Sequence, residues 1–225
     1  EKGYPSGSRV DLEMAMQAEA DPRYLEKIWE RKTIPHKFDY RFSILVDLSS
    51  SMQGEKIEET FKGVVVLAEV LERLGIQYEI LGFSDNSEIF KAWREKLDKK
   101  SRERLAQMKN WGRGNTATTE ATQRAYEELL KNLGKDNFLI TLTDGQPNDP
   151  ESLKQELKKI IEEKKVKLVG IGLGPGTEFV REFYTAAFSL PKMKVTEQER
   201  RQGQKDFSEA FAELLEDMIK HPEKY

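Results

Sequence analysis

Residues 42–51 read FSILVDLSSS, an apolar run that passes directly into a loop of oxygen side chains. The run is typical of a buried strand. Two later segments also carry oxygen side chains. Asp144-Gly145 follows the strand-like residues 138–143, and Gly114-Asn115-Thr116 forms a glycine turn. Because open α/β sheets place their ligands at the carboxyl ends of parallel strands, we expect the three segments to meet at one edge of a sheet.

The oxygen side chains in these segments predict one metal site. The candidate ligands are two carboxylates and three hydroxyls: Asp47, Ser49, Ser51, Thr116 and Asp144. These hard donors suit Mg²⁺, Mn²⁺ or Ca²⁺ rather than zinc or copper. Serine and aspartate are also common in turns and helix caps after strands, so the alternative is a set of caps without a metal. The prediction therefore depends on the combination of all three segments.

Strands and helices alternate along most of the chain. Strands are expected at residues 41–46, 77–83, 88–92, 137–143 and 166–172, and helices at 56–74, 101–108, 118–133, from Asp149-Pro150 onward, and at 207–219. This alternation predicts an α/β fold, a Rossmann-like, doubly wound and mostly parallel sheet with helices on both faces. Helix 56–74 is rich in valine and leucine and leaves little polar face, so we expect it to be buried on most sides.

The length of 225 residues allows one substantial core. We expect residues 41–221 to form one domain and residues 222–225 a short tail. The polar residues 1–40 are expected to be an N-terminal helical extension, with short helices at 12–20 and 22–31.

Composition excludes several classes of function. The chain has no cysteine, which rules out disulfides and thiolate chemistry and fits a cytoplasmic protein. No segment approaches the roughly 18 apolar residues of a membrane span, and no signal peptide is visible, so we expect no membrane partner. A net charge of −3 gives no general preference for polyanions, and nucleic acid is not an expected partner.

Charge is nevertheless concentrated in one segment. Residues 91–113 carry nine basic side chains against three acidic ones and lie just before Thr116. The segment is either a solvated helix face or a positive flank of the metal site. Trp93 and Trp111 bracket it, and they belong either to the core or to a recognition surface.

Enzymatic alternatives lack their reacting groups. The chain has only two histidines, no cysteine and no Gly-x-Ser-x-Gly motif. A haloacid-dehalogenase-like, Mg²⁺-dependent phosphatase would need a second aspartate where Ser49 stands. The glycines of residues 170–176 fit neither a dinucleotide fingerprint nor a phosphate loop, and we expect them to let the backbone turn at the sheet edge. We therefore predict that the chain is not an enzyme.

The set of motifs, in this order, resembles the von Willebrand factor A family and its metal-ion-dependent adhesion site, over about residues 40–220. The resemblance implies that Ser49, Ser51 and Thr116 ligate the metal through their hydroxyls, while Asp47 and Asp144 act mostly through water. It also implies an open metal position for an aspartate or glutamate carboxylate of a partner protein.

Finer details are similar to the A domains of the cobaltochelatase A-domain subunit and of nitric-oxide-reductase activation proteins, which work with AAA+ ATPases of the MoxR or chelatase type. The similar segments are residues 44–52, 78–83 and 143–149. The resemblance implies the partner-engaging component of an ATPase-coupled chaperone or cofactor-insertion system. The ordinary turn at residues 114–116 argues against cobalt insertion itself. The alternative is a stand-alone adhesion or scaffold module without an ATPase.

Overall fold

The computed structural model describes residues 9–10, 29–30, 39–111, 114–190 and 192–225, and it divides the chain into two compact units, Glu1–Phe38 and Asp39–Tyr225. In the first unit, β1 (Arg9–Val10) pairs antiparallel with β2 (Trp29–Glu30). The prediction of a helix at 22–31 is therefore wrong at residues 29–30, which form β2. The rest of that helix, and the helix expected at 12–20, lie outside the described residues.

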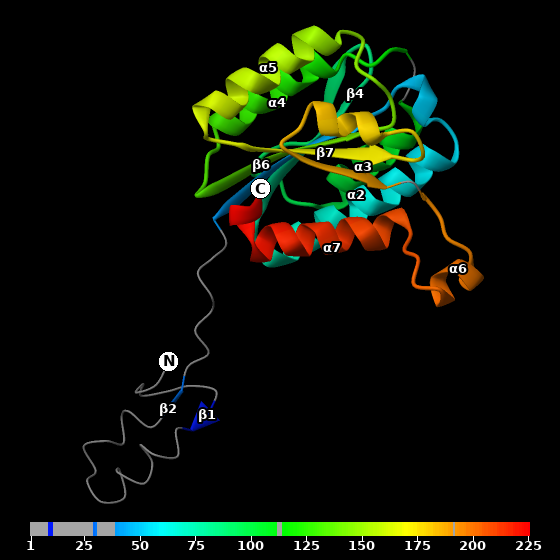
Figure 1. The fold of residues 1–225 in the computed structure, drawn as a ribbon. Helices are drawn as coiled ribbons and strands as arrows, with labels where there is room; N and C mark the ends of the chain where they lie inside the picture. Colours follow the sequence, from blue (N-terminus) through cyan, green and yellow to red (C-terminus); the bar gives the residue numbers. More distant parts are fainter. Residues whose placement is uncertain (1–8, 11–28, 31–38, 112–113, 191) are drawn as a thin grey trace, which may run out of the picture. The chain divides into compact units, whose positions relative to one another are not determined.

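The second unit is built on a six-stranded sheet in the order β5-β4-β3-β6-β7-β8 (Figure 1). The strands are β3 (Tyr40–Asp47), β4 (Gln77–Phe83), β5 (Ser87–Lys91), β6 (Asp136–Thr143), β7 (Lys167–Leu173) and β8 (Ala186–Leu190). Within this sheet, β4 and β5 pair antiparallel, and the other neighbouring strands are parallel. The predicted α/β fold with a mostly parallel, doubly wound sheet is confirmed.

Helices cover both faces of this sheet. The α-helices are α2 (Glu55–Leu74), α3 (Lys99–Ala106), α4 (Thr118–Leu130), α5 (Pro150–Glu163), α6 (Glu197–Arg201) and α7 (Phe207–Lys220). Short 3₁₀ turns are η2 (Ser50–Met52), η3 (Gln107–Asn110), η4 (Glu178–Glu182) and η5 (Pro222–Lys224). Figure 1 shows α4 and α5 on one face and α2 and α7 on the other. None of the described helices is long and apolar enough to cross a membrane.

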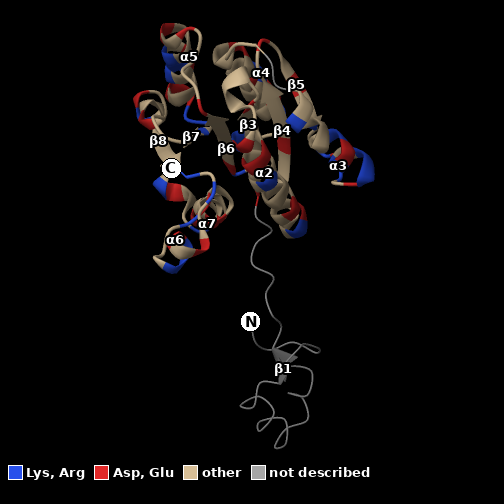
Figure 2. Cartoon of the chain, turned by 90° about the vertical axis from the view of Figure 1, so that its right-hand side faces the viewer, with Lys and Arg blue, Asp and Glu red and all other residues tan. Residues whose placement is uncertain are grey.

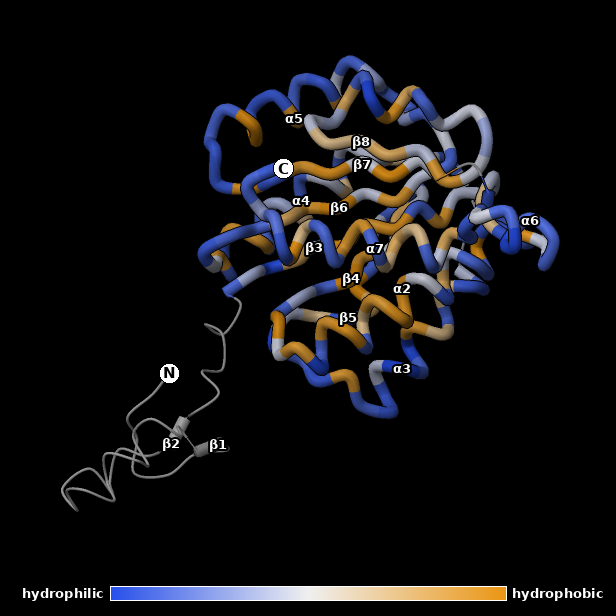
Figure 3. The backbone as a smooth tube through the Cα atoms, turned by 60° about the horizontal axis from the view of Figure 1, so that its bottom comes forward, coloured by the Kyte–Doolittle hydropathy of each residue, from blue (hydrophilic) through white to orange (hydrophobic). Residues whose placement is uncertain are grey.

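The apolar strands form the centre of the unit, and the polar sides of the helices face outward (Figure 3). Helix α2 is not buried on most sides, contrary to expectation, because Val66 and Val70 are 45% and 40% exposed on its outer side. The sequence pattern also gave no strand at 186–190. This five-residue edge strand is only half-buried, so its hydrophobic signal is short and weak.

The glycines of residues 170–176 have two separate roles. Gly170 and Gly172 lie inside β7, where a Cβ atom would come within 2.3 Å of the Tyr184 ring and 2.4 Å of Thr177 Oγ1. Their expected role in a turn is therefore wrong, because they make room for side chains packed on the strand. Gly174 and Gly176 have φ values of +90° and +80°, which suit the turn that follows β7.

The order of strands reverses between β3 and β6. From β3 the chain first adds β4 on one side and later adds β6 on the other, and Val46 pairs with Leu142 near the ends of the two strands. Asp47 and Thr143 are therefore neighbours at the carboxyl edge. Such a switch point is where open α/β sheets bind their ligands.

Candidate metal centre

Asp47 is the last residue of β3, and it is fully buried. Its Oδ1 accepts a hydrogen bond of 2.8 Å from the backbone N–H of Ser49, and its Oδ2 accepts one of 2.6 Å from Thr143 Oγ1. The pKa of Asp47 is raised above its ordinary value. Burial is the largest cause and the charge of Asp144 adds to it, while hydrogen bonds from Thr143 and Ser49 act in the opposite direction. Donors from the loop after β3 and from the end of β6 thus fix the orientation of this carboxylate.

A chain of hydroxyls joins the loop after β3 to the loop after β6. Ser49 Oγ and Ser51 Oγ are 3.0 Å apart, and Ser51 Oγ donates a 2.7 Å hydrogen bond to Asp144 Oδ1. The other carboxylate oxygen of Asp144 contacts the ammonium group of Lys56, which lies in the first turn of α2. Asp144 is therefore held between a hydroxyl and a cationic group.

Thr116 is placed by backbone hydrogen bonds. Its N–H donates to Asn148 Oδ1 and its carbonyl accepts from Asn148 N–H, both at 3.1 Å. A Cβ atom at Gly145 would lie 3.8 Å from Thr116 Oγ1 and 3.7 Å from Ser51 Oγ. The two hydroxyls therefore flank the same glycine, which has no side chain to fill the space between them.

The loop before Thr116 depends on Gly114. Its φ is +105°, and an added Cβ atom would lie 1.9 Å from Asp85 Oδ2. Asp85 Oδ1 accepts a 2.9 Å hydrogen bond from Asn115 N–H, and Ser50 donates to the Gly114 carbonyl through both its N–H and its hydroxyl. Glycine is thus required at position 114 both for its positive φ and for lack of space for a Cβ atom. Hydrogen bonds join this loop to the loops after β3 and β4.

The structure gathers the five predicted ligands at one edge of the sheet. Four of them, Asp47, Ser49, Ser51 and Asp144, are linked through hydrogen bonds, and Thr116 joins them beside Gly145. No cluster of three or more His, Cys, Asp or Glu side chains suited to a metal occurs among the described residues. A metal at this edge would therefore need the hydroxyl oxygens, and the two carboxylates and three hydroxyls fit a hard divalent cation.

Sequence reasoning missed four residues that support this set: Lys56, Asp85, Thr143 and Asn148. Asp85 and Thr143 carried a usable signal, because each is a polar residue at or just beyond the end of an apolar strand. Lys56 and Asn148 carried none, since their contacts depend on how α2 and the loop after β6 approach the edge of the sheet.

The basic residues of segment 91–113 lie mainly on α3 and η3. Figure 2 shows basic residues on α3. Arg102 pairs with Glu69 and Arg104 with Glu95, whereas Lys109 Nζ lies 4.9 Å from the centre of the Phe61 ring. The two tryptophans are half-buried: Trp93 packs against the core, and Trp111 lies edge-on to Phe90.

Known proteins share this fold, as a family model and solved structures show. The model of the von Willebrand factor type A domain family matches residues 43–199. No curated protein matches the chain. Among solved structures, the chain is similar to the PilB minor pilin from Streptococcus sanguinis, with a TM-score of 0.61 and 14% identity over 86% of this chain and 65% of the pilin.

Two further structures share the fold. Manganese-loaded TRAP protein from Plasmodium vivax has a TM-score of 0.52 and 21% identity, over 65% of this chain and 61% of that protein. The SpRpn10 VWA domain has a TM-score of 0.54 and 15% identity, over 72% of this chain and 94% of that domain. The chain thus spans less than two thirds of the pilin and of TRAP, and nearly the whole length of the SpRpn10 domain.

Proposed function

Because the chain belongs to the von Willebrand factor type A domain family, we propose that it binds a partner protein through a divalent metal ion. Members of this family are generally non-catalytic interaction modules. The observation that carries the proposal is the Ser51 hydroxyl, which contacts Ser49 on one side and Asp144 on the other. It joins two loops that are far apart in the sequence into one set of oxygen donors.

The ion would be held by Asp47, Ser49, Ser51, Thr116 and Asp144. Magnesium is the first candidate, with Mn²⁺ or Ca²⁺ as alternatives, because all five side chains offer hard oxygens. The manganese-loaded TRAP protein, which has the same fold, supports a divalent ion. The Lys56 ammonium contacts one oxygen of Asp144, so an ion bound through this carboxylate would compete with the lysine for it.

The partner would supply an aspartate or glutamate carboxylate. Three of the five donors are neutral hydroxyls, so the protein compensates the charge of a divalent ion with only two carboxylates. Asp47 and Thr116 are buried, whereas Ser51 is exposed. An incoming carboxylate would therefore approach from the side of Ser51.

The wider system is the second part of the proposal. We assign the chain to the cytoplasm, as the partner-engaging component of an AAA+ ATPase-coupled chaperone or cofactor-insertion system with the motor on another polypeptide. Support comes from the similarity of residues 44–52 and 143–149 to A domains that work with such ATPases. Co-purification of a tagged chain from its source cells tests this, and a stable partner set without any AAA+ ATPase would favour a stand-alone adhesion or scaffold module.

The metal is tested first by isothermal titration calorimetry of the metal-free chain with Mn²⁺ and with Mg²⁺. We expect one ion per chain and loss of binding in the double variant Ser49→Ala, Ser51→Ala. Ser50→Ala is the matched control, because Ser50 lies in the same loop but donates to the Gly114 carbonyl rather than joining the donor set. Equal Mn²⁺ binding by the double variant and the wild type would contradict the assigned ligands.

Partner binding is tested separately with the wild type, the double variant and Ser50→Ala as baits, each with Mg²⁺ or with EDTA. We expect partners that are retained by the wild type and by Ser50→Ala in Mg²⁺ and released by EDTA. Partners that stay bound to the double variant and in EDTA would refute recognition through the metal.

A further inference from the structure

Four cations lie close together in the chain at the start of α3: Arg94, Lys96, Lys99 and Lys100. Their side chains are exposed, that of Lys99 by 92%. Arg94, Lys96 and Lys100 make no ion pair with any described residue, and the contact between Lys99 and Glu103 is 3.9 Å long. Figure 2 shows basic residues on α3, and we call these four cations the basic surface.

Hydrogen bonds fold the loop of the basic surface tightly against the start of α3. The Lys96 carbonyl accepts from Asp98 N–H at 2.9 Å and from the Ser101 hydroxyl at 3.0 Å, and Asp98 Oδ1 accepts from Ser101 N–H at 2.9 Å. Glu95 pairs with the Arg104 guanidinium. Both acidic residues of the loop are thus engaged within it, whereas the four cations are left with exposed side chains.

Arg94 is also strained in its backbone. Its φ is +59°, in the left-handed region that residues other than glycine and asparagine rarely adopt. The other described non-glycine residue with a positive φ is Lys164, which is the C-cap of α5, a place where this conformation is common. Arg94 lies instead in a turn between β5 and α3. Because neither its backbone conformation nor an ion pair of its side chain stabilises the fold, Arg94 points to a role outside the chain.

Strand β5 leads away from the edge that carries the proposed metal centre. It begins with Ser87 opposite Phe83, the last residue of β4, and ends with Lys91 opposite Ile80 in the middle of that strand. The turn that contains Arg94 follows this end of β5. It therefore lies toward the opposite edge of the sheet.

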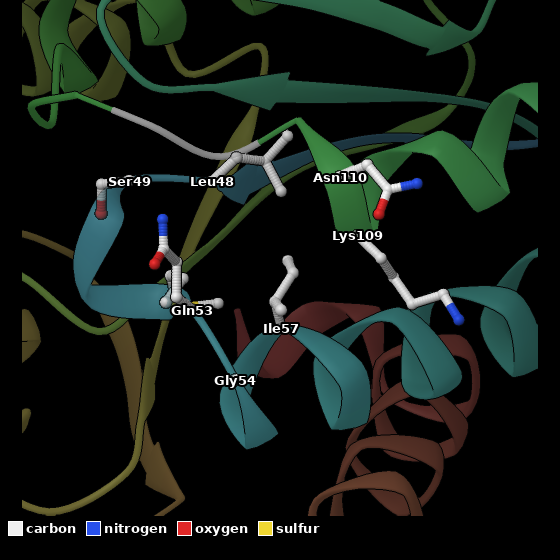
Figure 4. Close-up of a pocket in the computed structure, with 8 residues that line it drawn as sticks. Leu48, Ser49, Gln53, Gly54, Ile57, Lys109 and Asn110 are labelled. Carbon is white, nitrogen blue, oxygen red and sulfur yellow. The ribbon is translucent and has the colours of Figure 1, made fainter.

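The chain then returns to the metal edge along α2. Arg102 pairs with Glu69, whereas Lys109 lies over Phe61, which is about two helical turns nearer to the start of α2. Figure 4 shows Lys109 beside the hollow that Ser49 also lines. Lys109 thus belongs to the metal edge, and the basic surface lies at the other end of α3.

The charges of the basic surface suit separate carboxylates better than a polyphosphate. Glu95 and Asp98 lie among the four cations, and a continuous phosphate backbone would have to pass close to them. The neighbouring Trp93 packs against the core, so it offers no exposed ring on which a base could stack. An acidic protein segment can place single carboxylates on the cations and avoid the acidic residues.

We propose that the basic surface binds an acidic segment of a partner protein, and that this contact needs no metal ion. Attraction by the exposed cations would speed the encounter, and pairs with Arg94 and the lysines would hold the segment. The contact lies apart from the proposed metal centre and does not depend on it. A partner that uses both would be held at two separate places on the domain.

The probe is a fluorescein-labelled decaglutamate peptide, titrated with the full chain in EDTA and followed by fluorescence anisotropy. We expect saturable binding that weakens as salt is added. The double variant Lys96→Glu, Lys100→Glu should bind at least about tenfold more weakly. Lys154→Glu, Lys158→Glu is the matched control, because these exposed lysines of α5 have the same spacing and ion pairs of 3.9 Å. It changes the net charge equally and should bind like the wild type.

Arg94→Gly tests the strained position. We expect about threefold weaker peptide binding together with a higher urea midpoint, because glycine adopts a positive φ without strain. Lys164→Gly is the matched control, since it relieves the same backbone conformation at the end of α5. It should also raise the midpoint and leave peptide binding unchanged. A lower midpoint for Arg94→Gly would show that the arginine serves the fold, and unchanged peptide binding would show that it does not serve recognition; either result would overturn its assigned role.

Other outcomes would overturn the whole surface. These are no saturable binding by the wild type, or equal binding by Lys96→Glu, Lys100→Glu. The double variant Ser49→Ala, Ser51→Ala should bind decaglutamate like the wild type, and a loss there would place the peptide at the metal edge instead. Decauridylate or phosphatidylserine vesicles that bind more tightly than decaglutamate, and depend on the same lysines, would replace the protein segment with a nucleic acid or a membrane. None of these results bears on the metal proposal, because EDTA is present throughout.

Discussion

Two carboxylates are buried in neighbouring strands of the sheet, and their surroundings differ. Asp47, at the end of β3, accepts hydrogen bonds on both oxygens and lies beside a row of hydroxyls. Glu79, inside β4, pairs in register with Ser43 and accepts a 2.7 Å hydrogen bond from its hydroxyl, and burial raises the pKa of Glu79 to about 7. Burial of a carboxylate thus does not by itself indicate function; the donors arranged around it do.

The largest effect is expected from Asp47→Asn. The amide keeps the shape of the side chain but removes its charge and replaces one acceptor oxygen facing Ser49 or Thr143 with a donor. We expect Mn²⁺ affinity to fall at least about a hundredfold, at the upper end of what loss of a supporting group costs a metal site. Isothermal titration calorimetry measures this directly.

Glu79→Gln is the matched control, because it makes the same carboxylate-to-amide change in the neighbouring strand. Its Mn²⁺ affinity should equal that of the wild type. If both variants lost the metal to the same degree, the distinction between a functional and a structural carboxylate would be wrong.

The second effect is the pH dependence of stability that Glu79 causes. Its pKa of about 7 in the folded chain exceeds the ordinary 4.5, so the unfolded chain ionises first and stability falls as pH rises from about 4.5 to about 7. Glu128 adds to the rise in pKa and Arg124 opposes it. Glu79→Gln should remove the effect and be more stable than the wild type, by about 2 kcal/mol more at pH 8 than at pH 5.

Urea denaturation at pH 5, 6, 7 and 8 in EDTA measures this difference without interference from a metal. The advantage of Glu79→Gln over the wild type should grow steadily across the series. An advantage that stayed constant with pH would mean that Glu79 is ionised throughout, and its burial would then need another explanation.

The sequence predicted much of the site because each part carried a local signal. The apolar run before Asp47 and the one before Asp144 gave two strand ends, and parallel strands bring such ends to one edge. That β3 and β6 are direct neighbours was not visible, because strand order depends on how the whole chain packs. The Thr143 hydrogen bond to Asp47 follows from that adjacency and was missed for the same reason.

The predictions about the fold that were wrong share a different cause. Val66 and Val70 suggested a buried helix, but composition does not say which stripe of a helix meets the sheet. Gly170 and Gly172 suggested a turn, yet they lie in β7 because Tyr184 and Thr177 pack against the strand there. In both cases the deciding partner comes from another element, so a local pattern could not reveal it.

A third, intermediate effect is expected from Gly114→Ala. The methyl group would clash with Asp85 and would require a positive φ, so the turn before Thr116 must shift. We expect about tenfold weaker Mn²⁺ binding and a loss of roughly 1–2 kcal/mol in the free energy of unfolding. Calorimetry and urea denaturation measure the two quantities.

Gly203→Ala separates strain from displacement. Gly203 also has a positive φ, +83°, but nothing lies within 4 Å of an added Cβ atom. This control should lose stability through strain and keep its metal affinity. Equal affinities for Gly114→Ala and the wild type would show that the position of Thr116 does not matter for the ion.

The smallest effect concerns the cation already present beside Asp144. The Lys56 ammonium contacts one oxygen of that carboxylate, whose side chain is 0% exposed, so the lysine and the proposed metal would act on the same negative charge. Removing the lysine charge in Lys56→Met leaves Asp144 more available, and we expect Mn²⁺ affinity to rise about fivefold. Lys62→Met is the matched control, because Lys62 pairs with Glu59 on the same helix and has no contact with the donor set in the described structure. Weaker Mn²⁺ binding by Lys56→Met would instead make Lys56 a group that orients Asp144 for the metal. Asp144 would then depend on the lysine as Asp47 depends on the hydrogen bond from Thr143.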